Sequence, residues 1–195
     1  MKRLIFALCM LFSGLAGAQT YYQYVGPGLV YSHYQQELEF VEGNVPAGTL
    51  RYNSIIYGFS YGGKILVNKR PNFSYGVGAY PFGGVYLASF SNNVFGNIGV
   101  NLPVYGEVML GNPESYNMFL GLGFEYNFYK EFGFNMEHVI GPSVELGGQI
   151  DLPNRIIAVK LAYTYGLNKG RYDDPSLRVV SGRRGSFTAT LYYPF

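Results

Sequence analysis

The chain has a single cysteine and no tryptophan, and it has no long apolar run after its first residues. Its 195 residues include one cysteine, Cys9, and no tryptophan. The sequence after residue 18 therefore has no thiol, which excludes a disulfide framework, thiolate catalysis and cysteine-ligated metal sites. That part also has no apolar run near the roughly 20 residues that a membrane-spanning helix needs. If such a chain sits in a membrane, strand pairing must satisfy its backbone groups.

Charged residues are scarce, at 13% of the chain, and neither sign dominates. Lys2 and Arg3 precede an apolar segment, 4–12, and a group of small residues that ends at Ala18. This order predicts a cleaved secretory signal peptide over 1–18 rather than a membrane-anchoring or core helix. Cleavage removes Lys2 and Arg3, so the number of lysine and arginine residues falls from 14 to 12, equal to the 12 acidic residues. No basic excess remains to indicate a nucleic-acid partner.

Tyrosine, phenylalanine and glycine are abundant, at 20, 15 and 27 residues. Aromatic rings in such numbers are typical of proteins that anchor at membrane interfaces. Apolar residues recur with a period of two, which indicates strands. Eight segments of near-spanning length are predicted as strands: about 21–35, 49–61, 73–88, 97–110, 117–128, 139–150, 156–167 and 186–195. We therefore expect 19–195 to form one domain, an all-β, eight-stranded antiparallel up-and-down transmembrane β-barrel.

The alternation is clearest in 117–128. One face carries Met118, Leu120, Leu122, Phe124, Tyr126 and Phe128. The other carries Phe119, Gly121, Gly123, Glu125 and Asn127. A soluble β-sandwich would also alternate, but its polar face would meet water, where glycines serve poorly. Apolar residues toward lipid and small residues toward a narrow interior favour the barrel.

The connections alternate between tight turns and longer loops. Short turns are expected at 111–115 and 151–154, and longer loops at 36–48, 89–96, 129–138 and 168–185. A long connection is also expected at 62–72, and a short extra strand at Lys64–Lys69 would give a ten-stranded alternative. Pro27 and Pro81 interrupt their strands, so each predicts a bulge or local bend.

The last segment ends in an aromatic residue, Phe195. Alternate residues before it are apolar, including Phe187, Leu191 and Tyr193. This pattern resembles the signal that the outer-membrane barrel-assembly machinery reads. An ordinary terminal strand is the alternative interpretation. Pro194 departs from the usual pattern and predicts one missing ladder bond.

The second half, about 97–195, resembles the Bacteroidetes outer-membrane β-barrel family called PorT-like. The resemblance rests on Ile98–Pro103, Phe119–Gly123, Val144–Gly148, Leu161–Leu167 and Leu191–Phe195. It implies an outer-membrane barrel, usually of eight strands. It implies no single biochemical activity.

Charged side chains are expected inside the barrel, together with aromatic rings that fill it. Strand parity turns Glu107, Glu125, Glu145 and Lys160 inward, with Glu145 opposite or diagonal to Lys160. Buried charges are costly unless paired, so we expect a network of ion pairs in the lumen, with one carboxyl protonated or partnered elsewhere. Arg51 would join only if the parity of its strand were shifted by one. The remaining interior positions are expected to hold Tyr22, Tyr24, Tyr80, Phe82, Tyr86 and Tyr105.

Candidates for chemistry are few. His33 and His138 match no serine–histidine pattern of lipid-modifying barrels, so neither is predicted to be catalytic, and Ser143 lies five residues beyond His138. Two distant histidines without thiols make a poor metal site, and no cofactor is expected. Arginines cluster near the last loop at Arg171, Arg178, Arg183 and Arg184. A solvated loop and contact with lipopolysaccharide phosphates both remain open for them.

The expected protein is an integral outer-membrane barrel of a Gram-negative cell, non-enzymatic, with a structural or loop-mediated role at the cell surface. Its expected partners are outer-membrane lipid and lipopolysaccharide, the assembly machinery and other envelope proteins. A narrow channel or small-ligand carrier with a charged lumen is the first alternative. An enzyme that modifies lipid A or phospholipid is the second.

Overall fold

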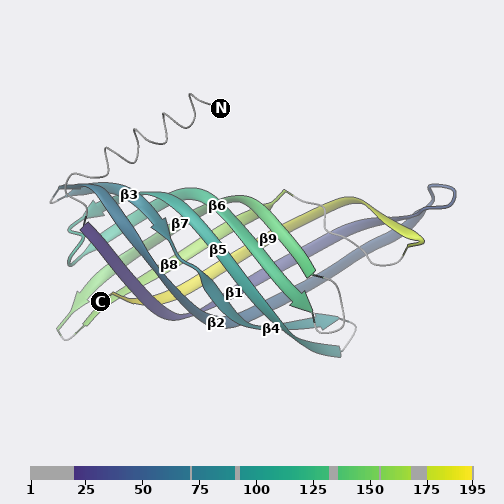
Figure 1. The fold of residues 1–195 in the computed structure, drawn as a ribbon, viewed down its shortest axis with the longest axis horizontal. Coiled ribbons are helices and arrows are strands. Elements are labelled where there is room, and N and C mark those ends of the chain that lie inside the picture. Colours follow the sequence, from purple (N-terminus) through teal and green to yellow (C-terminus); the bar gives the residue numbers. More distant parts are fainter. Residues whose placement is uncertain are drawn as a thin grey trace, which may run out of the picture.

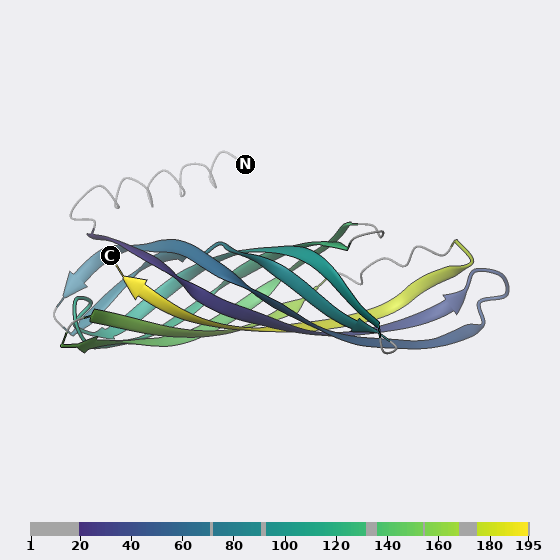
Figure 2. The ribbon, with the colours of Figure 1, turned by 90° about the horizontal axis from the view of Figure 1, so that it is seen from below.

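The computed structural model describes residues 20–70, 72–90, 93–131, 136–153, 155–167 and 175–194. They form an elongated sheet of strands that cross its long axis obliquely (Figures 1 and 2). The predicted signal peptide, Arg171 and Phe195 lie outside these ranges. Within them, no helix has the length and apolar character needed to cross a membrane.

The described ranges contain nine strands. Their bounds are β1 (Thr20–Phe40), β2 (Pro46–Arg70), β3 (Phe73–Ala79), β4 (Phe82–Phe90), β5 (Asn93–Gly111), β6 (Asn117–Glu131), β7 (Met136–Leu152), β8 (Arg155–Gly166) and β9 (Leu177–Pro194). The prediction of an all-β antiparallel fold is confirmed, because every pairing between these strands is antiparallel.

Each strand has a hydrogen-bonded neighbour on both sides. β3 and β4 follow one another in the space between β2 and β5, since β2 pairs with β3 over 63–70 and with β4 over 53–60. The first and last strands also pair, from Tyr24 opposite Pro194 to Phe40 opposite Leu177. Figure 2 shows β1 and β9 side by side along the molecule. No strand in the described part of the chain is therefore left as a full-length free edge.

Pro81 lies at the interruption predicted for its segment. The ladder stops at Tyr80 and Pro81, which divide the predicted strand 73–88 into β3 and β4. The break keeps its backbone bonds: the Tyr61 N–H donates to the Pro81 carbonyl (3.0 Å), and the Tyr80 N–H donates to the Pro103 carbonyl (3.4 Å). The chain thus bends without leaving these groups unpaired.

Of the bulge or local bend predicted at Pro27, the bulge is absent. β1 runs through it, and its register with β2 is unshifted where Pro27 faces Phe59. The ladder with β9 omits Gly26 and Pro27 but resumes at Gly28 in the same register. The missing proline N–H leaves a gap in that ladder, and the strand continues past it.

Most strands are longer than predicted, and the connection expected at 62–72 is wrong. Residues 62–70 belong to β2, so the extra strand of the ten-stranded alternative, Lys64–Lys69, is not separate from it. Two adjacent glycines are a turn signal in sequence. Here Gly62 and Gly63 are held extended, because they face Tyr24 and Gln23 of β1. The expected loops 36–48 and 168–185 also shrink, since β1 reaches Phe40 and β9 begins at Leu177.

Burial alternates along the strands as the sequence predicts. In β6, Leu120, Leu122 and Phe124 are exposed, whereas Gly121 and Glu125 between and beyond them are buried. β5 and β8 alternate in the same way. The inner face holds a cluster of rings and small residues: Tyr24, Tyr80, Tyr105, Ala158, Ala162 and Tyr192. Charged side chains share this inner face, so the interior differs from the apolar core of a soluble protein.

Candidate functional site

Six charged side chains are buried on the inner face of the sheet. Among the residues whose burial is described they are Lys64, Lys160, Arg184, Glu107, Glu125 and Glu145. Three are basic and three are acidic, so their formal charges cancel. Unpaired ions in such surroundings would be very costly, and this balance makes their burial tolerable.

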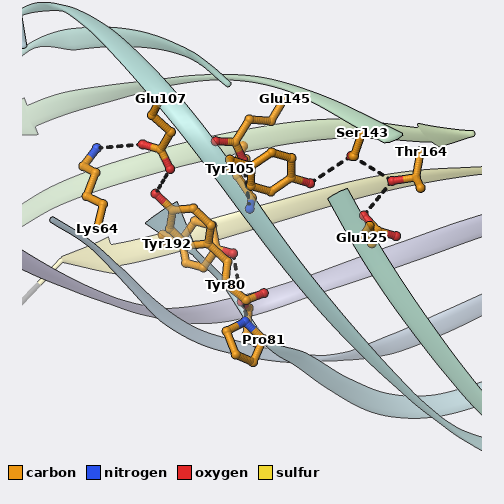
Figure 3. Close-up of polar contacts among 12 residues, drawn as sticks. Lys64, Tyr80, Pro81, Tyr105, Glu107, Glu125, Ser143, Glu145, Thr164 and Tyr192 are labelled. Carbon is orange, nitrogen blue, oxygen red and sulfur yellow. Dashed lines mark hydrogen bonds and ion pairs between the residues drawn. The ribbon is translucent and has the colours of Figure 1, made fainter. Parts of the chain in front are cut away.

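The first ion pair joins β2 to β5 (Figure 3). The Lys64 ammonium lies 4.0 Å from Oε2 of Glu107. The Tyr80 hydroxyl donates to Oε1 of the same carboxylate at 2.5 Å. Lys64 also lies over two rings, 5.1 Å from the centroid of Tyr24 and 4.8 Å from that of Phe119. The cation is therefore held by one carboxylate and by two aromatic faces.

The second ion pair joins β7 to β8. The Lys160 ammonium lies 3.2 Å from Oε2 of Glu145. In the ladder Glu145 faces Ala162 and Gly147 faces Lys160, so the two charged residues are diagonal neighbours. Cross-strand diagonal positions are within reach of long side chains.

Three tyrosine rings surround the Lys160 ammonium. Their centroids lie 3.7 Å (Tyr80), 4.9 Å (Tyr105) and 5.7 Å (Tyr192) from it. The rings also contact one another: the centroid of the Tyr80 ring lies 5.6 Å from that of Tyr192 and 6.5 Å from that of Tyr105. Ser60 fixes one edge of this cage, because its hydroxyl lies 2.8 Å from the Tyr192 hydroxyl. The cage combines cation–π attraction with close ring packing.

Glu125 forms a separate polar cluster. Its carboxylate accepts hydrogen bonds from Asn127 Nδ2 (2.7 Å), Thr164 Oγ1 (2.7 Å) and Ser186 Oγ (3.3 Å). Ser143 connects this cluster to the cage, since its hydroxyl lies 2.8 Å from Thr164 Oγ1 and 3.0 Å from the Tyr105 hydroxyl. Figure 3 shows this chain of contacts from Glu125 to Tyr105. A carboxylate with several donors needs no lysine beside it.

The four charged residues predicted for the interior are thus all buried, in two groups. Glu107 and Glu145 share the region of the two lysines, and Glu125 is partnered by neutral donors. The sequence interpretation missed Lys64, which it placed in a loop. Continuing the alternation through 62–70 would have turned Lys64 inward. Arg51, the residue considered for that role, is exposed on the other face.

The four loop arginines are not brought together. Arg171 lies outside the described residues. Arg178 is exposed and pairs with Glu39 at 3.0 Å. Arg183 is exposed, but Arg184 is buried with its guanidinium 4.8 Å from the centroid of the Tyr34 ring. Residues that follow each other in a strand point to opposite faces, so the Arg183 and Arg184 side chains do not extend from the same face of β9.

The residues of the predicted assembly signal line the outer face of β9. Phe187 and Tyr193 are exposed, and Leu191 is half-buried beside them. Pro194 faces Tyr24 of β1, so it lies where the last strand meets the first. Phe195, the terminal aromatic residue of the pattern, lies outside the described part of the chain.

The candidates for catalysis and metal binding are dispersed. His33 is exposed on β1, and its Nδ1 lies 2.8 Å from Oδ1 of Asn53. The His138 side chain and that of Tyr86 are not among those described. Ser143 is buried and donates to the Tyr163 carbonyl (3.1 Å). Among the described residues, no three histidine, cysteine or acidic side chains gather as a metal site.

Comparison with known proteins gives a fold and no family. No family model matches the chain, and neither does any curated protein. The outer membrane protein OprG from Pseudomonas aeruginosa aligns over 92% of this chain and 98% of its own, with 13% identity and a TM-score of 0.56. Outer membrane protease OmpT from Escherichia coli aligns over 89% of this chain and 97% of its own, with 11% identity and a TM-score of 0.44. Neisserial surface protein A aligns over 91% and 99%, with 12% identity and a TM-score of 0.43.

The likeness to OprG covers nearly the whole of both chains. Because the sequence identity is low, it supports a shared fold and nothing about function. The chain therefore has the fold of an outer-membrane β-barrel protein. The resemblance to PorT-like proteins still rests on sequence motifs alone and stays a prediction.

Proposed function

We propose that the chain is an integral outer-membrane protein of a Gram-negative cell, non-enzymatic, with a closed and filled barrel that presents an element at the cell surface. Because β3 and β4 occupy one place between β2 and β5, the nine strands take eight places in the sheet. An eight-stranded barrel is just wide enough for side chains to fill it. A PorT-like membership would agree with this architecture.

One observation carries the membrane assignment: the burial pattern is the reverse of that in a soluble protein. Leu122 and Phe59 are each 68% exposed, whereas Lys160 is 2% exposed. Outward apolar side chains occur on every strand whose burial is described in full. In water this much exposed apolar surface would cost about 25 cal/mol per Å². Contact with hydrocarbon removes that cost, and the mutual pairing of all strands satisfies the backbone there.

The filled interior supports a structural role over transport or catalysis. The caged Lys160 and the Lys64–Glu107 pair are buried in the interior. The contacting rings of Tyr24 and Tyr80 connect them. Solutes would have to displace paired charges and packed rings to pass. Buried ion networks of this kind are often structural. We therefore rank the narrow channel and the lipid-modifying enzyme below a structural and interaction role.

An extension of three strands supports presentation at the surface. β1 has 21 residues and β2 has 25, while a tilted strand crosses a bilayer in about 9–11 residues. Roughly ten residues of β1 and roughly fifteen of β2 therefore lie outside the bilayer. Figure 1 shows β1, β2 and β9 running past the other strands at the end opposite the start of β1. We assign that end to the exterior, with the start of β1 and the end of β9 on the periplasmic side.

The extension is braced by contacts of β9, and of the residue just before it, with the end of β1 and the turn that follows. Arg178 of β9 bonds to Glu39 and donates to Asn44 Oδ1 at 2.7 Å. The Val41 N–H donates to the Ser176 carbonyl at 2.8 Å. At the tip, Phe40, Val41 and Val45 are about half exposed. A rigid tip with exposed apolar side chains suits contact with other envelope or surface proteins.

The membrane assignment is tested by fractionation and a heat-modifiability gel. We expect the protein in the outer-membrane fraction, released by detergent, with an unboiled band that migrates differently from the boiled one. A folded barrel resists unfolding in cold detergent, because its ladder has no free edge at which to open. A polypeptide that remains monomeric and folded in buffer without detergent would refute the proposal.

The orientation is tested by an epitope inserted between Gly43 and Asn44. Both residues have positive φ angles, 82° and 52°, at the tip of the β1–β2 turn, where insertions are tolerated. We expect an antibody to label this epitope on intact cells. The matched control is the same epitope in the opposite turn between Asn112 and Pro113, which should be labelled only after permeabilisation. Labelling of the control alone on intact cells would reverse the orientation.

A further inference from the structure

A hollow of about 390 Å³ opens on the outer face of β1, β9 and β8. Its floor is Gly185, which faces His33 of β1 on one side and Tyr165 of β8 on the other. Neighbouring outward positions carry side chains, and glycine carries none. The row His33–Gly185–Tyr165 therefore has no side chain at its middle, and the Tyr163 ring leans over it, since a Cβ on Gly185 would lie 2.7 Å from the Tyr163 hydroxyl. A bound molecule would enter the hollow beside this ring.

One end of the hollow is aromatic. In the adjacent row, Tyr31 of β1 faces Phe187 of β9, and Phe187 faces Tyr163 of β8. All three rings are exposed and line the hollow. Three rings in line across three strands make a continuous apolar platform, which suits an acyl chain.

The other end of the hollow is cationic. Gln35 of β1 faces Arg183 of β9 and Arg51 of β2. Gln35 and Arg183 line the hollow, and Arg51 lies just outside its lining, on the far side of Gln35. Both arginines are exposed, and among the described residues neither has an ion-pair partner. His33 lies in the row between this end and the rings, held through Nδ1 by Asn53. Arg184 also borders the hollow, but its guanidinium is turned inward over Tyr34.

A carboxylate limits the cationic end. Glu37, the next outward residue of β1, accepts a hydrogen bond from Ser181 Oγ at 2.5 Å. An anion is therefore attracted between Arg51 and Arg183 and repelled beyond them. Along β1 the order is aromatic at Tyr31, then His33, then cationic at Gln35 and its neighbours. In the orientation proposed above, the cationic end is the outer one.

We propose that this hollow binds an outer-leaflet lipid through its phosphate-bearing headgroup. Its phosphate lies between Arg51 and Arg183, and an acyl chain lies over Tyr31, Phe187 and Tyr163. Guanidinium groups bind phosphate through paired, charge-assisted hydrogen bonds. The rings distinguish this site from a simple anion site, because a soluble anion gains nothing from them. This inference rests on the proposed membrane location.

The test measures binding of bis-phosphorylated lipid A to the folded protein in neutral detergent, by native mass spectrometry. Dephosphorylated lipid A and inorganic phosphate are the comparison probes. Arg183→Gln and Arg51→Gln should each weaken lipid A binding by about tenfold or more, the value of one charge-assisted contact. Arg178→Gln is the matched control, because it removes an exposed β9 arginine outside the hollow and should leave the affinity within about twofold.

Three results would overturn the inference. If dephosphorylated lipid A bound equally well, the phosphate would not contribute to binding. If inorganic phosphate competed at the same concentration as lipid A, the acyl chain would not contribute. If Arg178→Gln weakened lipid A binding as much as the other two variants, binding would reflect general charge attraction and not this hollow. A wrong membrane assignment would be recognised separately, because the heat-modifiable band would be absent. That band is established before the binding assay is run.

Discussion

Replacing Lys160 with methionine should lower the free energy of unfolding by about 3–5 kcal/mol, the usual effect of removing one member of a buried ion pair. Methionine keeps most of the side-chain volume but leaves Glu145 without its cation, 3.2 Å from where the ammonium lay. The carboxyl must then remain an uncompensated charge or bind a proton. The rings of Tyr80 and Tyr105 also lose the cation that they surround. Denaturant titration of the barrel in lipid vesicles measures the change.

Arg178→Met is the matched control for this prediction. It also breaks a Lys/Arg–Glu pair, but at a site where the arginine side chain is 54% exposed. Water screens such pairs, so this variant should lose no more than about 1 kcal/mol. The double variant Lys160→Met with Glu145→Gln should lose less than the two single variants together, because the pair is removed as a unit. Equal losses for Lys160→Met and Arg178→Met would show that the interior pair does not stabilise the barrel.

The same variant separates the structural role from the narrow channel. Planar-bilayer recordings of the wild-type protein should show no stepwise current, because the Lys160 cage and the Lys64–Glu107 pair fill the interior. Stepwise current in the wild type that Lys160→Met alters would favour the channel. The outcome bears on the lumen alone, since the surface extension does not depend on it.

Alternation was enough to predict which way most side chains point. With a period of two, a strand can be placed in only two ways, and its apolar residues decide which face points outward, as in 117–128. The inward positions of Glu107, Glu125, Glu145 and Lys160 follow when this rule is applied to each of their strands. The same rule, continued upstream from Phe187, would also have separated Arg183 from Arg184.

Partners across the barrel were beyond the reach of the sequence. Lys64 meets Glu107 only because β3 lies between their strands, and the register of two ladders sets their distance. Strand ends were equally inaccessible. Gly62 and Gly63 look like a turn until β1 supplies their hydrogen-bonding partners. Nor does the spacing reveal the outer hollow, because His33, Gly185 and Tyr165 share a row through pairings of distant segments.

Gly26→Ala should disrupt the junction between the first and last strands. A Cβ on Gly26 would collide with the backbone oxygen of Leu191, and it would lie 2.8 Å from the Leu191 carbonyl carbon and 3.0 Å from Cα of Tyr192. All three atoms belong to the backbone of β9, so no side-chain rotation relieves the clash. β1 and β9 would have to separate where their ladder is already interrupted by Pro27. We expect a loss of about 3 kcal/mol or more, at the upper end of overpacking effects.

Gly83→Ala provides the contrast, because a Cβ there meets no atom within 4 Å. It should change the free energy of unfolding by no more than about 0.5 kcal/mol, as surface substitutions generally do. Both variants lose one glycine from a strand, so they share any effect on the unfolded chain. The difference between them therefore measures the closeness of β1 to β9. If the two variants unfold at the same denaturant concentration, the first and last strands are not packed as tightly as the structure describes, and the closed barrel loses its main support.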